Sequence, residues 1–215
     1  MQHTHTYTIA TAATALGFAF FLKAVPALFA AAHALRPRGK HLDAFQARDK
    51  LCIAINAVLT TGMTYHTLGY VLKSPNILKD PADMTLLNTL GALPLLFATY
   101  DLFYSQLHRA LHHRSLYAYV HKHHHRQVVP TRGLLDSINV HPFEYVSGEY
   151  IHLLTIHVVC RFLFPLHCAA CLLFLSLGGV CATLNHTRLG VRVSLPGVRV
   201  PVFDVRAHDT HHCVP

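Results

Sequence analysis

Apolar residues in this chain are gathered into long runs instead of being spread at amphipathic spacing. Four such runs stand out, at Ile9–Ala34, Leu51–Leu72, Leu86–Tyr104 and Val146–Leu184. A helix needs roughly 20 apolar residues to cross a bilayer core, so each of the first three runs predicts one membrane span. The fourth is too long for one crossing and holds Pro165 near its middle, which predicts a helical hairpin broken near Phe164–Pro165. The pattern predicts an all-α fold: an integral membrane helical bundle of about three single spans plus a helical hairpin.

The first run has a second interpretation, as a cleaved signal peptide. Small residues in Leu28–Ala34 would suit cleavage, but the preceding stretch Met1–Thr8 contains no Lys or Arg. A signal peptide needs a positively charged start, so we expect a membrane span here.

Charged residues between the runs predict the orientation. The segment Arg36–Lys50 carries five basic residues against two acidic ones, whereas Lys73–Asp83 carries two of each. By the positive-inside rule, the first connection is cytosolic and the second is lumenal. The third run then emerges into the cytosol just before the first histidine cluster.

Composition agrees with a membrane protein, with 52% hydrophobic and 13% charged residues. The formal charge of +8 would suit a nucleic-acid partner, but the basic residues lie between apolar runs and form no basic face on a polar chain. No nucleic acid is therefore expected. Most of the six cysteines lie in apolar stretches without paired CxxC modules, and we expect them to be small buried hydrophobes: Cys52, Cys160, Cys168, Cys171 and Cys181.

Twenty histidines are the unusual feature of the chain, and many fall into ordered groups. An HxxxH pair follows the third run, and an HxxHH pattern occurs twice, at His121 and at His208. Residues three and four apart share a helix face, which brings their imidazoles together. Low-complexity tracts have no reason to keep helical phase over about a hundred residues. With His186 after the fourth run, the predicted metal ligands are His108, His112, His121, His124, His125, His186, His208, His211 and His212.

The number of these histidines favours two metal ions, because a single zinc takes about four protein ligands. Imidazole binds Zn, Cu, Fe and Ni alike, so ligand type alone leaves the metal open. The helical hairpin would return the chain to one face of the membrane and let the distant clusters meet there. Histidines outside the pattern are expected to be non-ligands: His3, His5, His33, His41, His66, His152, His157 and His167.

These motifs resemble the fatty acid hydroxylase superfamily, which includes sterol C-4 methyl oxidases, sterol C-5 desaturases and lipid hydroxylases. The resemblance covers roughly residues 85 to 213 and is carried by Asp101–His113, Leu116–His125, His141–Glu144, Asn185–His186 and His208–His212. It divides the chain into N-terminal membrane spans (1–84) and a catalytic domain (85–215). The single His186, without a histidine four residues on, favours the sterol-type branch.

The resemblance implies an O2-dependent oxidoreductase that hydroxylates or desaturates a sterol or long-chain lipid. It implies two Fe ions in a cytosolic histidine-rich helical cap, with electrons from NAD(P)H through cytochrome b5 or a similar carrier. It also implies a multi-pass protein of the endoplasmic reticulum membrane. Asp101, Glu144 and Asp209 are the carboxylates expected to orient ligands, and His141 is left open between ligand and structural donor.

Two other functions compete with this one. Relatives usually continue with a tail that contains Trp, whereas this chain ends at Cys213–Pro215 and has no Trp, so a truncated, inactive homologue is an alternative. A histidine-rich membrane protein that binds or transports metal is another. A transporter would place ionisable residues inside its spans, but Leu86–Tyr104 carries only Asp101 near its end.

Overall fold

The computed structural model describes residues 16–17, 20–24, 33–34, 44–127, 130–195 and 198–213. The first apolar run lies mostly outside these residues, and with it the choice between a span and a signal peptide. His3, His5 and His41 lie outside them as well.

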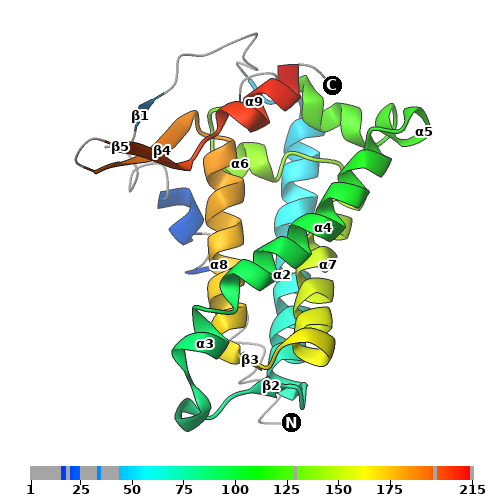
Figure 1. The fold of residues 1–215 in the computed structure, drawn as a ribbon. Coiled ribbons are helices and arrows are strands. Elements are labelled where there is room, and N and C mark those ends of the chain that lie inside the picture. The colour runs from blue at the N-terminus through cyan, green and yellow to red at the C-terminus, as the bar shows by residue number, and fades with distance from the viewer. Residues whose placement is uncertain are drawn as a thin grey trace.

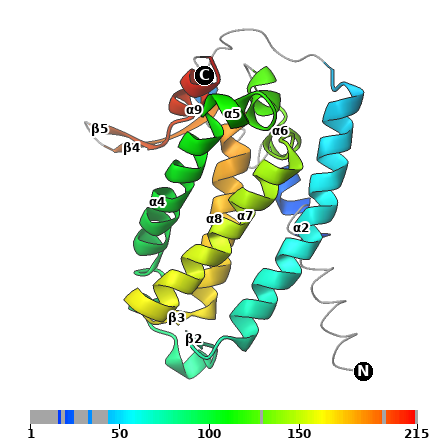
Figure 2. The same ribbon diagram turned by 90° about the vertical axis from the view of Figure 1, so that its right-hand side faces the viewer.

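Four long helices make a bundle (Figure 1): α2 (Ala47–Lys73), α4 (Leu93–Leu111), α7 (Pro142–Val158) and α8 (Cys168–Asn185). Helices α7 and α8 lie between α2 and α4 (Figure 2). Leu96, Ile156 and Phe174 are fully buried in their shared core, where Phe97 meets Phe174 edge to face at 5.0 Å between ring centroids. Cys52, Cys160 and Cys171 are free and buried as predicted, whereas Cys168 and Cys181, also predicted to be buried, are free but only half-buried.

The fourth apolar run folds as two helices joined by a turn, as the predicted hairpin requires, although only its second helix, α8, is among the candidate membrane spans. Helix α7 continues into a π-helical turn, η3 (Val159–Leu163), and the helix ends before Phe164–Pro165. A short strand β3 (Leu166–His167) follows and pairs in parallel with β2 (Ile77–Leu78), before α8 runs back along the bundle. The chain on both sides of this hairpin therefore lies at the same end of the bundle.

Short elements close the two ends of the bundle. The lower end in Figure 1 holds β2, β3 and α3 (Leu86–Thr89), with the 3-10 turn η1 (Pro81–Asp83) between β2 and α3. The upper end, called here the histidine end, holds α5 (Arg114–Tyr117), the 3-10 helix η2 (His121–Arg126), α6 (Leu134–Ser137) and α9 (Arg206–Cys213).

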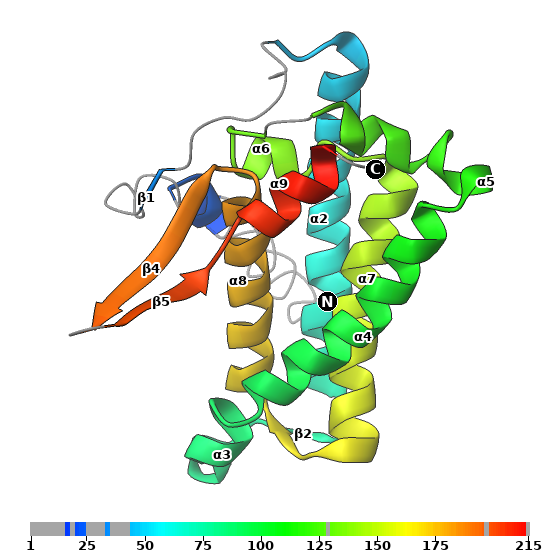
Figure 3. The same cartoon turned by 45° about the horizontal axis from the view of Figure 1, so that its top comes forward.

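The all-α prediction is right for most of the described chain but misses a β-hairpin. Strands β4 (Leu189–Leu195) and β5 (Val198–Phe203) pair antiparallel, and β1 (His33–Ala34) adds to β4. The hairpin projects from the histidine end beside α8 (Figure 3). Its sequence signal is the alternation in Val191–Leu195, which has the two-residue period of a strand, followed by the turn-forming pair Pro196–Gly197.

The predicted spans need one further correction. The third run is two helices, α3 and α4, and α4 extends to Leu111, well beyond Tyr104. Within the described residues, two helical segments have the length and hydropathy of a membrane span, Leu86–Leu111 and Cys168–Asn185. Helix α2 covers the second predicted span at 27 residues, but it is not apolar enough to join them.

Candidate metal centre

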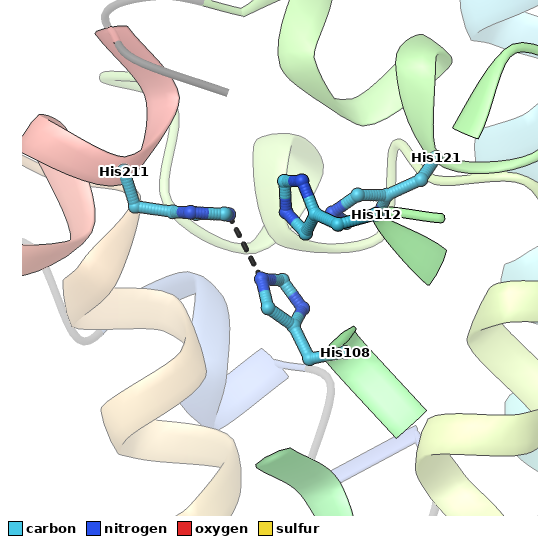
Figure 4. A group of neighbouring side chains, drawn as sticks. All are labelled: His108, His112, His121 and His211. Carbon is cyan, nitrogen blue, oxygen red and sulfur yellow. Dashed lines mark hydrogen bonds between the residues drawn. The ribbon is translucent and has the colours of Figure 1, made fainter. Parts of the chain in front are cut away.

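Eight of the nine predicted ligands lie in two groups at the histidine end. Group one is His108, His112, His121 and His211, and group two is His124, His186, His208 and His212. Within each group, one ring nitrogen per residue lies within 4.8 Å of all the others. Figure 4 shows the rings of group one turned toward a common space. The ninth, His125, lies against group one, where its Nε2 is 3.1 Å from His121 Nε2, and its ring centroid is 5.1 Å from that of His212 in group two.

Four separate elements supply these side chains. His108 and His112 come from the last turn and C-cap of α4, and His186 is the C-cap of α8. The other histidines come from η2 and α9. About a hundred residues separate the first ligand from the last, and the return of the chain through α7 and α8 brings them together (Figure 1).

Each HxxHH cluster divides between the two groups, which corrects the prediction that a cluster faces one site. In α9, His208 and His212 are one turn apart and share group two, while His211 points to group one. Neighbouring residues on an α-helix differ by about 100° in direction, so His211 and His212 point to different sides of α9. The cluster at His121 is in a 3-10 helix, not the expected α-helix, and also sends one histidine to each group.

Distances between the ring nitrogens match the spacing of ligands around an ion. His108 Nε2 lies 2.9 Å from His211 Nε2, and His208 Nε2 lies 3.0 Å from His212 Nε2 and 3.3 Å from His186 Nε2. Nitrogens about 2.0–2.1 Å from one shared ion lie roughly 3.0–3.4 Å from each other. His112 Nε2 is also buried without a hydrogen-bond partner in the described structure. The donor set therefore fits two metal ions.

Partners of the outer ring nitrogens hold two of the imidazoles in place. His121 Nδ1 lies 2.9 Å from Glu144 Oε1, and both side chains are buried. His186 Nδ1 donates to the carbonyl of Ala182 at 2.7 Å, which leaves its Nε2 free to bind a metal. Glu144 thus occupies the orienting position expected of it.

Asp101 and His141 do not take part in this way. Asp101 is exposed on α4, about two turns before His108, and the Asp209 side chain lies outside what the structure describes. His141 is the N-cap of α7, where its Nδ1 accepts a hydrogen bond from the Phe143 amide at 3.2 Å. That contact gives His141 a structural role.

Burial and crowding lower the pKa of several of the clustered imidazoles. Burial, and then the charge of neighbouring histidines, lowers the pKa of His125 to about 3 and that of His211 to about 4. The same two causes hold the pKa of His124 and His208 well below the usual value. Because a metal binds the unprotonated ring nitrogen, these histidines are ready to act as ligands near neutral pH.

Helix α2 supplies a second buried network, which sequence reasoning missed. The Asp49 carboxylate is fully buried and accepts hydrogen bonds from the Gln46 amide at 2.7 Å, Asn139 Nδ2 at 3.3 Å and Arg126 at 3.4 Å. His123 points away from the metal ligands, with Nε2 2.9 Å from Asn139 Oδ1 and 3.5 Å from Asp49. We call Asp49, His123, Arg126 and Asn139 the α2 clamp, since it ties α2 to η2.

Asn56 lies about two helical turns after Asp49 on α2 and makes a similar connection. Its Nδ2 donates to the carbonyls of Ile138 and Val140, at 2.8 and 2.9 Å, and so holds the segment before α7. The sequence signal for this contact was a polar side chain inside an apolar run. Burying such a side chain raises the free energy of the fold, so it usually has a function.

The predicted non-ligands that the structure describes lie apart from both groups. His66 and His157 bond to tyrosines between α2 and α7. His167 caps α8, and His152 lies against the ring of Tyr100 at 4.3 Å between centroids. The His33 side chain lies outside what the structure describes.

Comparison with known proteins agrees with the motifs and with this geometry. Residues 93–214, more than half of the chain, match the family described as fatty acid hydroxylase. The chain belongs to the fatty acid hydroxylase family. The matched residues contain all nine clustered histidines, whereas α2 and the clamp residue Asp49 precede them.

One curated relative of this fatty acid hydroxylase family member is the lathosterol oxidase of Rattus norvegicus. It is 31% identical over 126 residues, which are 57% of this chain and 38% of the rat protein. The match therefore spans well under half of the relative's length. No solved structure matches the chain.

Proposed function

We propose that this chain is an O2-dependent oxidoreductase that hydroxylates or desaturates a sterol or long-chain lipid with two iron ions. The observation that carries the proposal is the pair of histidine groups side by side at one end of an apolar bundle. Similarity to a lathosterol oxidase supports a sterol-type substrate.

Group one would hold one ion and group two the other, with His125 beside group one. Iron supplies the ability to bind and activate O2 for attack on an unactivated C–H bond. Glu144 would hold the His121 ring in position through its Nδ1, and the Ala182 carbonyl does the same for His186. The α2 clamp would keep η2 in place, because η2 supplies histidines to both groups.

Membrane placement is part of the same proposal. Large apolar side chains point outward along the bundle, among them Val58, Leu102, Leu172 and Leu177, and would face lipid. We propose a multi-pass protein of the endoplasmic reticulum, with the histidine end in the cytosol. A lipid substrate would then reach the metals from the bilayer edge.

The surface of the histidine end suits an acidic electron carrier. Arg109, Arg114 and Lys122 are exposed there, close in sequence to the metal-ligand candidates. A positive surface attracts an acidic partner and speeds its association. We therefore propose that electrons come from NAD(P)H through a cytochrome b5-type carrier.

Metal content of the detergent-purified chain tests the proposal. We expect about two irons per chain, and about one after His112→Ala or His186→Ala, because each variant removes a ligand from one group. His113→Ala is the matched control, since His113 follows His112 but belongs to neither group, and it should keep both irons.

Other outcomes would point to the competing functions. No stoichiometric metal in the wild-type chain would indicate an inactive homologue, and freely exchanging zinc would indicate metal transport or sensing. If iron is present, comparing the lipids of cells with and without the chain would identify the substrate class.

A further inference from the structure

The β-hairpin of β4 and β5 has a different composition on each of its two faces. Val193 pairs with Val200, and Leu195 pairs with Val198. Residues directly opposite each other in an antiparallel pair lie on the same face of the sheet, so these four residues share one face, called here the aliphatic face. Successive residues of a strand alternate between faces, so the other face holds Arg192, Ser194, Arg199 and Pro201.

The hairpin leaves the bundle at the point where α8 ends. Helix α8 has the length and hydropathy of a membrane span and ends at Asn185, and β4 begins soon afterwards at Leu189. Figures 1 and 2 both show the hairpin extending sideways from the upper end of α8, across the direction of the bundle. The hairpin therefore stays near the level at which α8 would leave a bilayer.

No described element packs broadly over the aliphatic face. Among the described elements, β4 contacts mainly β5, β1 and α8, and β5 contacts mainly β4. Strand β1 pairs along the edge of β4, and Leu189 at the start of β4 packs near Leu184 of α8. A small sheet needs a partner over its apolar face to be stable. The aliphatic face thus needs a partner beyond the described residues.

The bilayer fits both the position and the composition of the hairpin. Its start at the end of a candidate membrane span brings it to the boundary between acyl chains and headgroups. An amphipathic helix at this boundary turns its apolar face to the acyl chains and keeps its basic residues on the other side, and the same physics applies to an amphipathic hairpin. Arg192 and Arg199 occupy the face opposite the aliphatic residues, as this arrangement requires.

The position of the hairpin along the chain gives such a contact a consequence for the candidate metal centre. The hairpin connects His186, at the end of α8, to α9, which carries three of the clustered histidines. Only Asp204 and the fully buried Val205 separate β5 from α9. A hairpin held at the membrane surface would therefore also fix the depth of α9 relative to the bilayer.

We propose that the hairpin of β4 and β5 is an interfacial membrane anchor in the leaflet at the histidine end. The aliphatic face rests on the acyl chains of that leaflet, and Arg192 and Arg199 lie on the headgroup side. The inference goes beyond the proposed function and rests on its membrane orientation, but not on its metal content.

Tryptophan fluorescence of the full chain tests this inference, because the wild-type sequence contains no Trp. Val200→Trp places the probe on the aliphatic face, and Ser194→Trp places the same probe on the opposite face. Each variant is placed in nanodiscs of phosphatidylcholine with or without bromine on the acyl chains. Bromine quenches only at short range, so we expect it to remove most of the emission of Val200→Trp and little of that of Ser194→Trp.

Acrylamide in the aqueous phase gives the reverse measurement. It should quench Ser194→Trp several times more strongly than Val200→Trp. Equal quenching of both variants by bromine would overturn the proposal, because the two faces would then have the same surroundings. Emission from Val200→Trp that neither quencher reduces would overturn it as well, since another protein segment or a second copy of the chain would then cover the aliphatic face.

Two further variants keep the test decisive. Leu177→Trp is the reference for lipid contact, because Leu177 is exposed on α8 away from the hairpin. Strong bromine quenching of Leu177→Trp without quenching of Val200→Trp would refute the anchor alone, and no quenching of either would refute the membrane placement. If Val200→Trp lowers the thermal unfolding midpoint, Val193→Trp replaces it, because Val193 is the directly paired residue on the same face.

Iron content measured on the same samples separates the anchor from the proposed function. Bromine quenching of Val200→Trp in a chain that holds no iron would refute the proposed function and leave the anchor standing. About two irons per chain, without that quenching, would refute the anchor and leave the proposed function standing.

Discussion

The histidine end and the contact between α2 and α7 use the same side chain in opposite ways. At the histidine end, imidazole nitrogens face one another at 2.9–3.3 Å, although two unprotonated nitrogens have no hydrogen to share. Between α2 and α7, His66 and His157 each face a tyrosine hydroxyl, which satisfies the ring by an ordinary hydrogen bond. The difference shows that the partner of a histidine, and not the histidine itself, indicates a metal site.

The largest expected effect comes from removing a predicted metal ligand, in comparison with removing a histidine that bonds a tyrosine. His186→Ala removes a ligand of group two and should lower iron from about two to about one per chain. His157→Ala, the counterpart at the contact between α2 and α7, should leave iron unchanged. Elemental analysis of both variants checks this, and iron loss in His157→Ala would erase the distinction between the two kinds of contact.

Removal of the clamp carboxylate should have the next largest effect. Asp49→Ala leaves Asn139, Arg126 and the Gln46 amide without their shared acceptor in a buried place. Breaking a buried charge network in this way costs about 3 kcal/mol. Thermal unfolding of the detergent-solubilised chain measures the loss.

Asp101→Ala is the control for the clamp, because Asp101 is exposed on α4. It should leave the unfolding midpoint within error of the wild type. An equal drop in both variants would mean that Asp49 has no special role.

A weaker effect is expected where an orienting group is altered and the ligands are kept. Glu144→Gln preserves size and an acceptor for His121 Nδ1 but removes the negative charge. Such partners typically contribute 10- to 100-fold to metal affinity, so we expect iron to be lost to a chelator at roughly tenfold lower concentration. Chelator titration followed by iron analysis checks this, and an unchanged titration would show that the carboxylate charge does not support His121.

The smallest effect is expected at the contact between α2 and α7. Tyr150→Phe removes only the hydroxyl that bonds His66, and both side chains are exposed. We expect a loss of about 0.5–1 kcal/mol in unfolding free energy, typical of one hydrogen bond, with iron content unchanged. A shift as large as that of Asp49→Ala would contradict the view that these bonds are local.

Several features could be predicted from residue order alone. The apolar runs predicted the hairpin broken at Phe164–Pro165, because helix length and proline chemistry are local properties. The histidine spacings identified the family and predicted the nine residues that the fold gathers at one end. The β-hairpin after α8 also had a local signal, its two-residue alternation, which the surrounding apolar helices obscured.

Only the tertiary structure decided how those histidines are divided and what supports them. Whether His211 joins His108 or His208 depends on where α9 docks, and α9 is about a hundred residues from α4. In the sequence, Asp49 is one acidic residue in a basic segment. Only the packing of the helices shows that it contacts Asn139 and Arg126. Spacing along a chain fixes the direction of a side chain on its own helix, but its partner is set by helices that come from elsewhere in the sequence.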